Sequence, residues 1–202
     1  GLEIQDRFKN RLRSAYPGAR RRYQGVDFLA RYLGYSRAVQ ADESKPFTHP
    51  STSAAINSYF DHGAAGDAPA ATAREIVEAF DAAEKFFDVS DTRLAFYTRG
   101  ADGKRKFSKL AATTHMVAAR FLLDLIATGK IAEADAMAAA EAVAVEAPTK
   151  QQSATIWDFQ ARVLLGLRDH LGAAEATSSI ERWRRFFVKM EFCRLPPEFG
   201  ED

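Results

Sequence analysis

Apolar residues recur at helical spacing along most of the chain, which has 202 residues. In the clearest case, between Thr72 and Phe87, Ile76 and Phe80 lie on one face of a helix and charged residues lie on the other. Either Thr72 or the Asp67 that precedes Pro69 begins this helix. The same spacing predicts further helices over residues 2–15, 19–39, 51–60, 108–127, 131–147, 153–171 and 178–193.

Two of these helices differ from the usual amphipathic pattern. The one that begins at Ser108 is apolar on nearly every side, which predicts a central, buried position. The helix over residues 131–147 consists mainly of alanine, so it can approach its neighbours closely. Its larger apolar residues are expected to anchor it; they are Ile131, Met137, Val143 and Val145.

The segment from Leu94 to Lys109 interrupts the helical pattern. Asp102 and Gly103 form a favourable turn pair between two short runs, which predicts a β-hairpin. An alternative is a plain connector that ends where Ser108 caps the next helix. The predicted fold class is therefore all-α, an irregular bundle of about eight helices with a short β-hairpin near residues 94–107.

Composition fits one soluble domain over residues 1–202, although a division into 1–127 and 128–202 is an alternative. The chain begins with Gly1 and lacks an initiating Met, so we expect it to be a fragment of a longer protein. The formal net charge is +1, so no overall field attracts nucleic acid or a membrane. The single Cys193 excludes an internal disulfide and fits a reducing compartment. A cytoplasmic location without membrane contact is predicted.

Residues suited to catalysis or metal binding do not form a recognisable pattern. The four histidines lack metal-ligand spacing, so neither a metal site nor a cofactor is predicted. We interpret His115 as a hydrogen-bonded core histidine. The alternatives that we considered and set aside are a loop metal site at His49, Asp61 and His62, a ribonuclease-like Arg168-Asp169-His170, a phosphate loop at Thr128-Gly129-Lys130, and a nucleophilic Cys193.

Basic residues gather in three places and suggest local binding to phosphates. One group lies in the predicted hairpin, one near the start of the chain, and one beside Trp183 at Arg182, Arg184 and Arg185. Solvated surface or pairing with an acidic neighbour is the alternative for each. The candidate nucleic-acid-binding residues are Arg99, Lys104, Arg105, Lys106, Lys109, Arg20, Arg21 and Arg22.

The order of elements from about residue 20 to residue 126 resembles the C-terminal helical region of the GmrSD-like, ParB/sulfiredoxin-fold proteins of bacterial DNA restriction and phage defence. The resemblance is carried by residues 23–33 (YQGVDFLARYL), 56–60 (INSYF), 79–82 (AFDA), 95–99 (AFYTR) and 103–106 (GKRK). The family's Asp-Gly-Gln-Gln-Arg type motif and its His-Asn-His nuclease do not occur in this sequence. The resemblance therefore implies an accessory part without catalytic residues.

From these observations we expect a non-catalytic helical domain that supports a neighbouring catalytic domain of the same protein and contacts DNA. A helical adaptor that binds a protein segment in an apolar groove is the alternative from another class. An enzyme with a site built around His115 is a third. The sequence does not define the oligomeric state.

Overall fold

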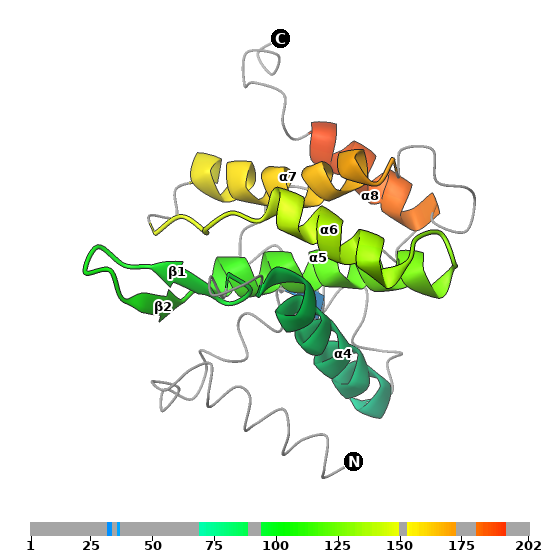
Figure 1. Cartoon of the computed structure of the whole chain (residues 1–202), viewed down its shortest axis with the longest axis horizontal. Helices are drawn as coiled ribbons and strands as arrows, with labels where there is room; N and C mark the ends of the chain where they lie inside the picture. The colour runs from blue at the N-terminus through cyan, green and yellow to red at the C-terminus, as the bar shows by residue number, and fades with distance from the viewer. Residues whose placement is uncertain are drawn as a thin grey trace.

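The computed structural model describes Tyr32, Leu33 and Ser36, and residues 69–88, 94–149, 153–172 and 181–192. Within these ranges the chain is mostly helical, with one short antiparallel hairpin (Figure 1). The predicted helices over 2–15 and 51–60 lie outside the described residues. The elements are α4 (Pro69–Phe87), β1 (Tyr97–Arg99), β2 (Arg105–Phe107), α5 (Lys109–Ala127), α6 (Glu133–Val143), α7 (Ser153–His170) and α8 (Glu181–Phe192).

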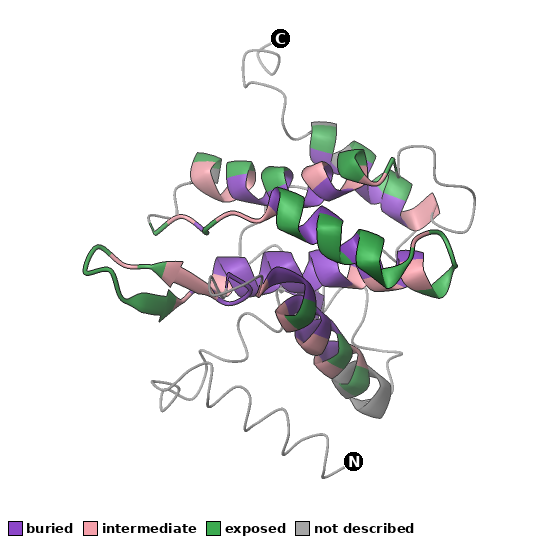
Figure 2. Cartoon of the chain, viewed as in Figure 1, coloured by how far each residue is buried: buried purple, intermediate pink, exposed green. Residues whose placement is uncertain are grey.

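Helix α5 lies at the centre, as its all-round apolar sequence predicted, and most of its residues are buried (Figure 2). Its start is fixed locally, because the Ser108 hydroxyl accepts a hydrogen bond from the backbone N–H of Ala111 at 3.2 Å. It ends at Ala127, Thr128 is the C-cap, and Gly129 has a φ of +67°, a conformation that glycine adopts without strain.

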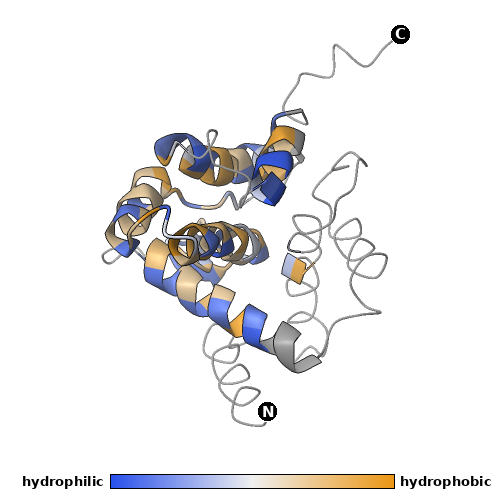
Figure 3. Ribbon diagram, turned by 90° about the vertical axis from the view of Figure 1, so that its right-hand side faces the viewer, coloured by the Kyte–Doolittle hydropathy of each residue, from blue (hydrophilic) through white to orange (hydrophobic). Residues whose placement is uncertain are grey.

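The other helices cover α5 with their apolar sides (Figure 3). Helix α4 crosses α5 and also contacts α6, whereas α7 packs against α5, α6 and α8. Aromatic rings join α8 to the core: the Phe121 ring of α5 lies 5.1 Å from Trp183 and 5.0 Å from Phe187. The described helices therefore share one continuous apolar core.

The prediction for the alanine-rich helix was wrong at both ends, because α6 spans only Glu133–Val143. At its start, the Asp135 carboxylate accepts a hydrogen bond from the Ala132 N–H at 3.0 Å, which satisfies a free donor at the helix terminus. Residues 144–148 have no regular secondary structure, and Pro148 disfavours helical geometry at Ala147 directly before it. Met137 is 43% exposed rather than an anchor; alanines and Val143 bury this helix instead.

Helix α5 is also the one helix among the described residues that is long and apolar enough to cross a membrane. In the structure 78% of its apolar window is buried by the protein itself. A helix buried to this extent by its own protein is typical of the core of a globular domain.

Candidate nucleic-acid interface

The predicted hairpin is confirmed, and it protrudes from one end of the helical body (Figure 1). Tyr97 pairs with Phe107, Thr98 with Lys106, and Arg99 with Arg105. The Gly100 N–H donates to the Lys104 carbonyl at 2.8 Å, which extends the pairing and leaves a three-residue loop.

Gly103 explains why this loop can close. The Gly103 N–H donates to the Gly100 carbonyl at 2.9 Å, and Gly103 has a φ of +73°. This is the arrangement of a common three-residue hairpin loop, in which the last position is left-handed and favours glycine. The Asp102-Gly103 pair therefore gave the turn correctly from sequence.

The register divides the basic residues between the two faces of the hairpin. Arg99 and Arg105 are direct cross-strand partners and share one face. Lys106 pairs with Thr98 and so lies on the other face, together with Lys104 two residues earlier. The two faces therefore each carry two positive charges.

The base of the hairpin is held by buried groups. The backbone of Ala95 is bonded on both sides, because its N–H donates to Asp88 Oδ1 at 3.1 Å and its carbonyl lies 2.9 Å from His115 Nδ1. Phe96 stacks on Phe80 with the ring centroids 4.2 Å apart, and the Thr98 hydroxyl donates to the Ala147 carbonyl. The hairpin is thus attached to the core rather than to a loose loop.

The outer part of the hairpin is exposed. Residues 101–106 and Arg99 all have exposed side chains (Figure 2). Two carboxylates lie near the cations: Asp102 Oδ1 is 3.7 Å from Lys106 Nζ, and Glu146 Oε1 is 3.4 Å from Arg99 Nε. Since all four of these side chains are about half exposed, the pairs are weak and open to competition by another anion.

His115 is a fully buried histidine, as predicted from its apolar helix. Its ring stacks on Phe87 with centroids 4.4 Å apart and meets Phe159 edge-on at 5.6 Å. Because the Ala95 carbonyl can only accept, Nδ1 carries the proton, and the buried Nε2 has no hydrogen-bond partner among the described residues. Burial lowers the pKa of His115 to about 4 and outweighs the opposing effect of the Ala95 hydrogen bond. This environment positions the hairpin and does not resemble a solvent-accessible catalytic site.

Asp124 is the centre of a polar cluster that the sequence did not predict. Its carboxylate accepts hydrogen bonds from Arg182 Nη2 at 2.6 Å and Trp183 Nε1 at 2.8 Å, and Arg120 Nη2 forms an ion pair with it at 3.2 Å. Tyr32 and Ser36 also line a small cavity beside this cluster. The volume open to the centre of a water molecule is about 10 Å³, so the cavity holds about one water. The cluster joins α5 to α8, and the cavity beside it is too small to hold a nucleotide.

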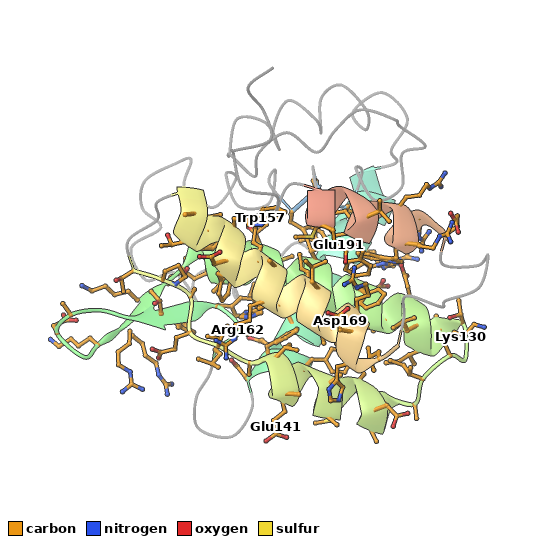
Figure 4. All side chains as sticks on the ribbon, turned by 90° about the horizontal axis from the view of Figure 1, so that it is seen from above. Lys130, Glu141, Trp157, Arg162, Asp169 and Glu191 are labelled. Carbon is orange, nitrogen blue, oxygen red and sulfur yellow. The ribbon has the colours of Figure 1, made fainter. Side chains whose placement is uncertain are left out.

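Arg168 likewise has a structural role. Its guanidinium binds Asp169 at 2.6 Å and Glu191 at 2.5 Å, and so ties α7 to α8. Figure 4 shows these two labelled acids where the helices run side by side. Burial disfavours the charged form of Arg168, but the bonds to Glu191 and Asp169 outweigh this and raise its pKa. These ion pairs give no support to the alternative of a ribonuclease-like site at Arg168-Asp169-His170.

The structure places the candidate basic residues in different regions. Arg99, Lys104, Arg105 and Lys106 come together in the hairpin, and Lys109 begins α5 directly behind it. The group on α8 lies at the other end of the molecule (Figures 1 and 4), where Arg182 binds Asp124 and Arg184 binds Glu181. The candidates outside the described residues are Arg20, Arg21, Arg22, His49, Asp61, His62 and Cys193.

The described residues contain no group of three or more His, Cys, Asp or Glu side chains that could hold a metal ion. Thr128-Gly129-Lys130 forms the end of α5 and not a phosphate loop. No family model, curated protein or solved structure matches the chain. The class that fold and site define is therefore a mostly helical protein with a protruding, basic β-hairpin.

Proposed function

We propose that this chain is a non-catalytic helical domain that contacts the phosphate backbone of DNA through its hairpin. The observation that carries the proposal is the exposure of Arg99, Lys104, Arg105 and Lys106 on an arm whose base is fixed in the core. Because the core fixes the backbone of this arm, the backbone does not have to be ordered when the basic side chains bind phosphates.

The wider context of the proposal follows from the resemblance to the GmrSD-like restriction and phage-defence proteins. There the chain would be an all-α domain of about eight helices in a cytoplasmic protein, next to a catalytic domain. The segment AFYTR lies in and before β1, and GKRK lies in and before β2, so the best-described part of the resemblance is the hairpin itself.

The adaptor alternative has less support within the described residues. A docking groove for a protein segment needs a contiguous apolar surface. The exposed large apolar side chains there are Met137 on α6 and Val188 on α8. These are single residues on separate helices, and single exposed apolar residues are normal on protein surfaces.

The direct test is to change Lys104, Arg105 and Lys106 to alanine and to measure binding to a fluorescent 20-base-pair DNA duplex at several salt concentrations. Each lost phosphate contact is expected to reduce the slope of log affinity against log salt by about 1. The triple variant should therefore bind more weakly at low salt and depend less steeply on salt.

A matched control changes Lys130, Arg184 and Arg185, three exposed basic residues away from the hairpin, to alanine. This control removes the same net charge, so it should lose clearly less affinity. Equal losses in the two triple variants would contradict a hairpin-specific contact, as would salt-independent binding.

Replacement of Glu146 by glutamine should strengthen the same binding. Glu146 neutralises Arg99 and repels phosphates, so its loss should raise affinity at low salt by a factor of about two to five, the scale of an exposed ion pair. The gain should fade at high salt. Glu141→Gln, on the exposed surface of α6, is the control and should change affinity little. No gain for Glu146→Gln relative to Glu141→Gln would argue against Arg99 as a phosphate contact.

A further inference from the structure

We infer that the hairpin enters the major groove of B-form duplex DNA tip first, with each of its two faces directed toward one phosphate wall of the groove. This inference rests on the proposed function and adds to it the form of nucleic acid and the mode of docking. It follows from the hairpin's register, dimensions and attachment.

The distribution of charge favours a docking mode that uses both faces over a flat one. A ribbon that lies across one backbone presents a single face to the phosphates. Here Arg99 and Arg105 occupy one face, whereas Lys104 and Lys106 occupy the other. Insertion between two phosphate walls lets the arginine pair and the lysine pair both contact phosphates.

The space at Gly100 locates the Lys106 side chain on its own face of the ribbon. A side chain built at Gly100 would come within 2.9 Å of Lys106 Nζ and 2.7 Å of Asp102 Oδ1. Gly100 therefore leaves the space across which the Lys106 side chain lies. The lysine extends over the ribbon on the face away from Arg99.

The dimensions match a major groove. Three residues separate the Arg99–Arg105 pair from the tip at Asp102, which projects at most about 10 Å beyond that pair at about 3.3 Å per residue. The B-form major groove is about 8.5 Å deep and about 12 Å wide. A ribbon with side chains on both faces is about 10 Å thick, so it fits there but not in a minor groove about 6 Å wide.

A-form RNA provides no equivalent site. Its major groove is too narrow and deep for protein side chains to enter, and its minor groove is shallow. A single strand offers one backbone and therefore one wall. The two-faced ribbon thus favours duplex DNA over both alternatives.

The acidic tip is compatible with this arrangement. Asp102 would repel phosphates if the tip lay on a backbone, but at the floor of the groove it faces base edges instead. Its carboxylate is also engaged within the hairpin, because Oδ1 accepts from the Lys104 N–H at 3.2 Å. Aspartate can accept a hydrogen bond from the cytosine amino group in this groove.

The experiment compares two double variants of the full chain, Arg99→Gln with Arg105→Gln and Lys104→Gln with Lys106→Gln. Binding is measured by fluorescence anisotropy with a 20-base-pair DNA duplex, an RNA duplex of the same sequence, and the single DNA strand. We expect the two variants to lose affinity for the DNA duplex by factors within about threefold of each other. The unaltered chain should prefer the DNA duplex to the RNA duplex by at least about tenfold.

Two outcomes would overturn groove insertion: a loss confined to one face, or equal affinity for the DNA and RNA duplexes. The RNA comparison uses the unaltered chain, so it stays decisive even if a variant folds poorly by circular dichroism. If the unaltered chain binds none of the three nucleic acids, the proposed function fails as well. If the unaltered chain binds DNA but the two double variants lose affinity unequally, only the assignment to the major groove fails.

Discussion

Replacement of Asp124 by alanine is expected to lower the free energy of unfolding by about 3 kcal/mol. The carboxylate accepts hydrogen bonds from Arg182 and Trp183, forms an ion pair with Arg120 and is itself almost fully buried. Arg120 and Arg182 are partly exposed, so both can regain water in the variant. Trp183 is only 2% exposed, so its indole N–H would stay buried without an acceptor, and that is the largest part of the cost.

The measurement is urea unfolding followed by tryptophan fluorescence and circular dichroism at neutral pH. Asp158→Ala, on the exposed surface of α7, removes the same group where it has no hydrogen bond or ion pair within the described part of the chain, and should change stability by less than about 0.5 kcal/mol. Asp124→Asn keeps one acceptor oxygen and should fall between these values. A loss for Asp124→Ala as small as that for Asp158→Ala would show that the cluster does not stabilise the packing of α8 on α5.

Acidification from pH 7 to pH 4 should destabilise the protein by up to about 3 kcal/mol through His115 alone. The folded chain holds the pKa of His115 at about 4, below its ordinary value of 6.5. The unfolded chain therefore binds the proton more strongly, so stability is complete above pH 6.5 and falls as the pH drops toward 4. The difference between the two values, at about 1.36 kcal/mol per pH unit, sets the size of the effect.

A variant separates this effect from the titration of carboxylates. His115→Gln has no ionisable group, and its amide can still donate to the Ala95 carbonyl. Urea unfolding at several values between pH 7 and pH 4 should show a steeper loss of stability in the unaltered protein than in this variant. Parallel curves for the two proteins would mean that the titration of buried His115 does not contribute to the loss of stability.

Local features of the fold were predictable from the sequence because their causes lie within a few residues. Ser108 caps α5 through a donor three residues away, and the hairpin loop depends on Gly103. The all-round apolar pattern of α5 gave its central position. The basic residues of the hairpin were identified, but their division between two faces required the register.

Features that depend on distant residues were not predictable. Asp124 meets Arg182 and Trp183 across 58 and 59 positions, and no local pattern marks such a pair. Hydrophobic periodicity predicted a longer α6, because alanines occur both inside the helix and beyond its end and so do not mark where it stops. It also chose Met137 by hydrophobicity, although small side chains were what the contact with the neighbouring helices required.

The contact between α6 and α7 has a consequence for how the sequence can change over time. A side-chain carbon added at Gly166 would lie 3.0 Å from Val143 Cγ1, so the two helices approach too closely for growth on either side. Volume gained at position 166 must be given up at position 143. During evolution, a larger residue at position 166 is therefore expected to occur together with a smaller residue at position 143.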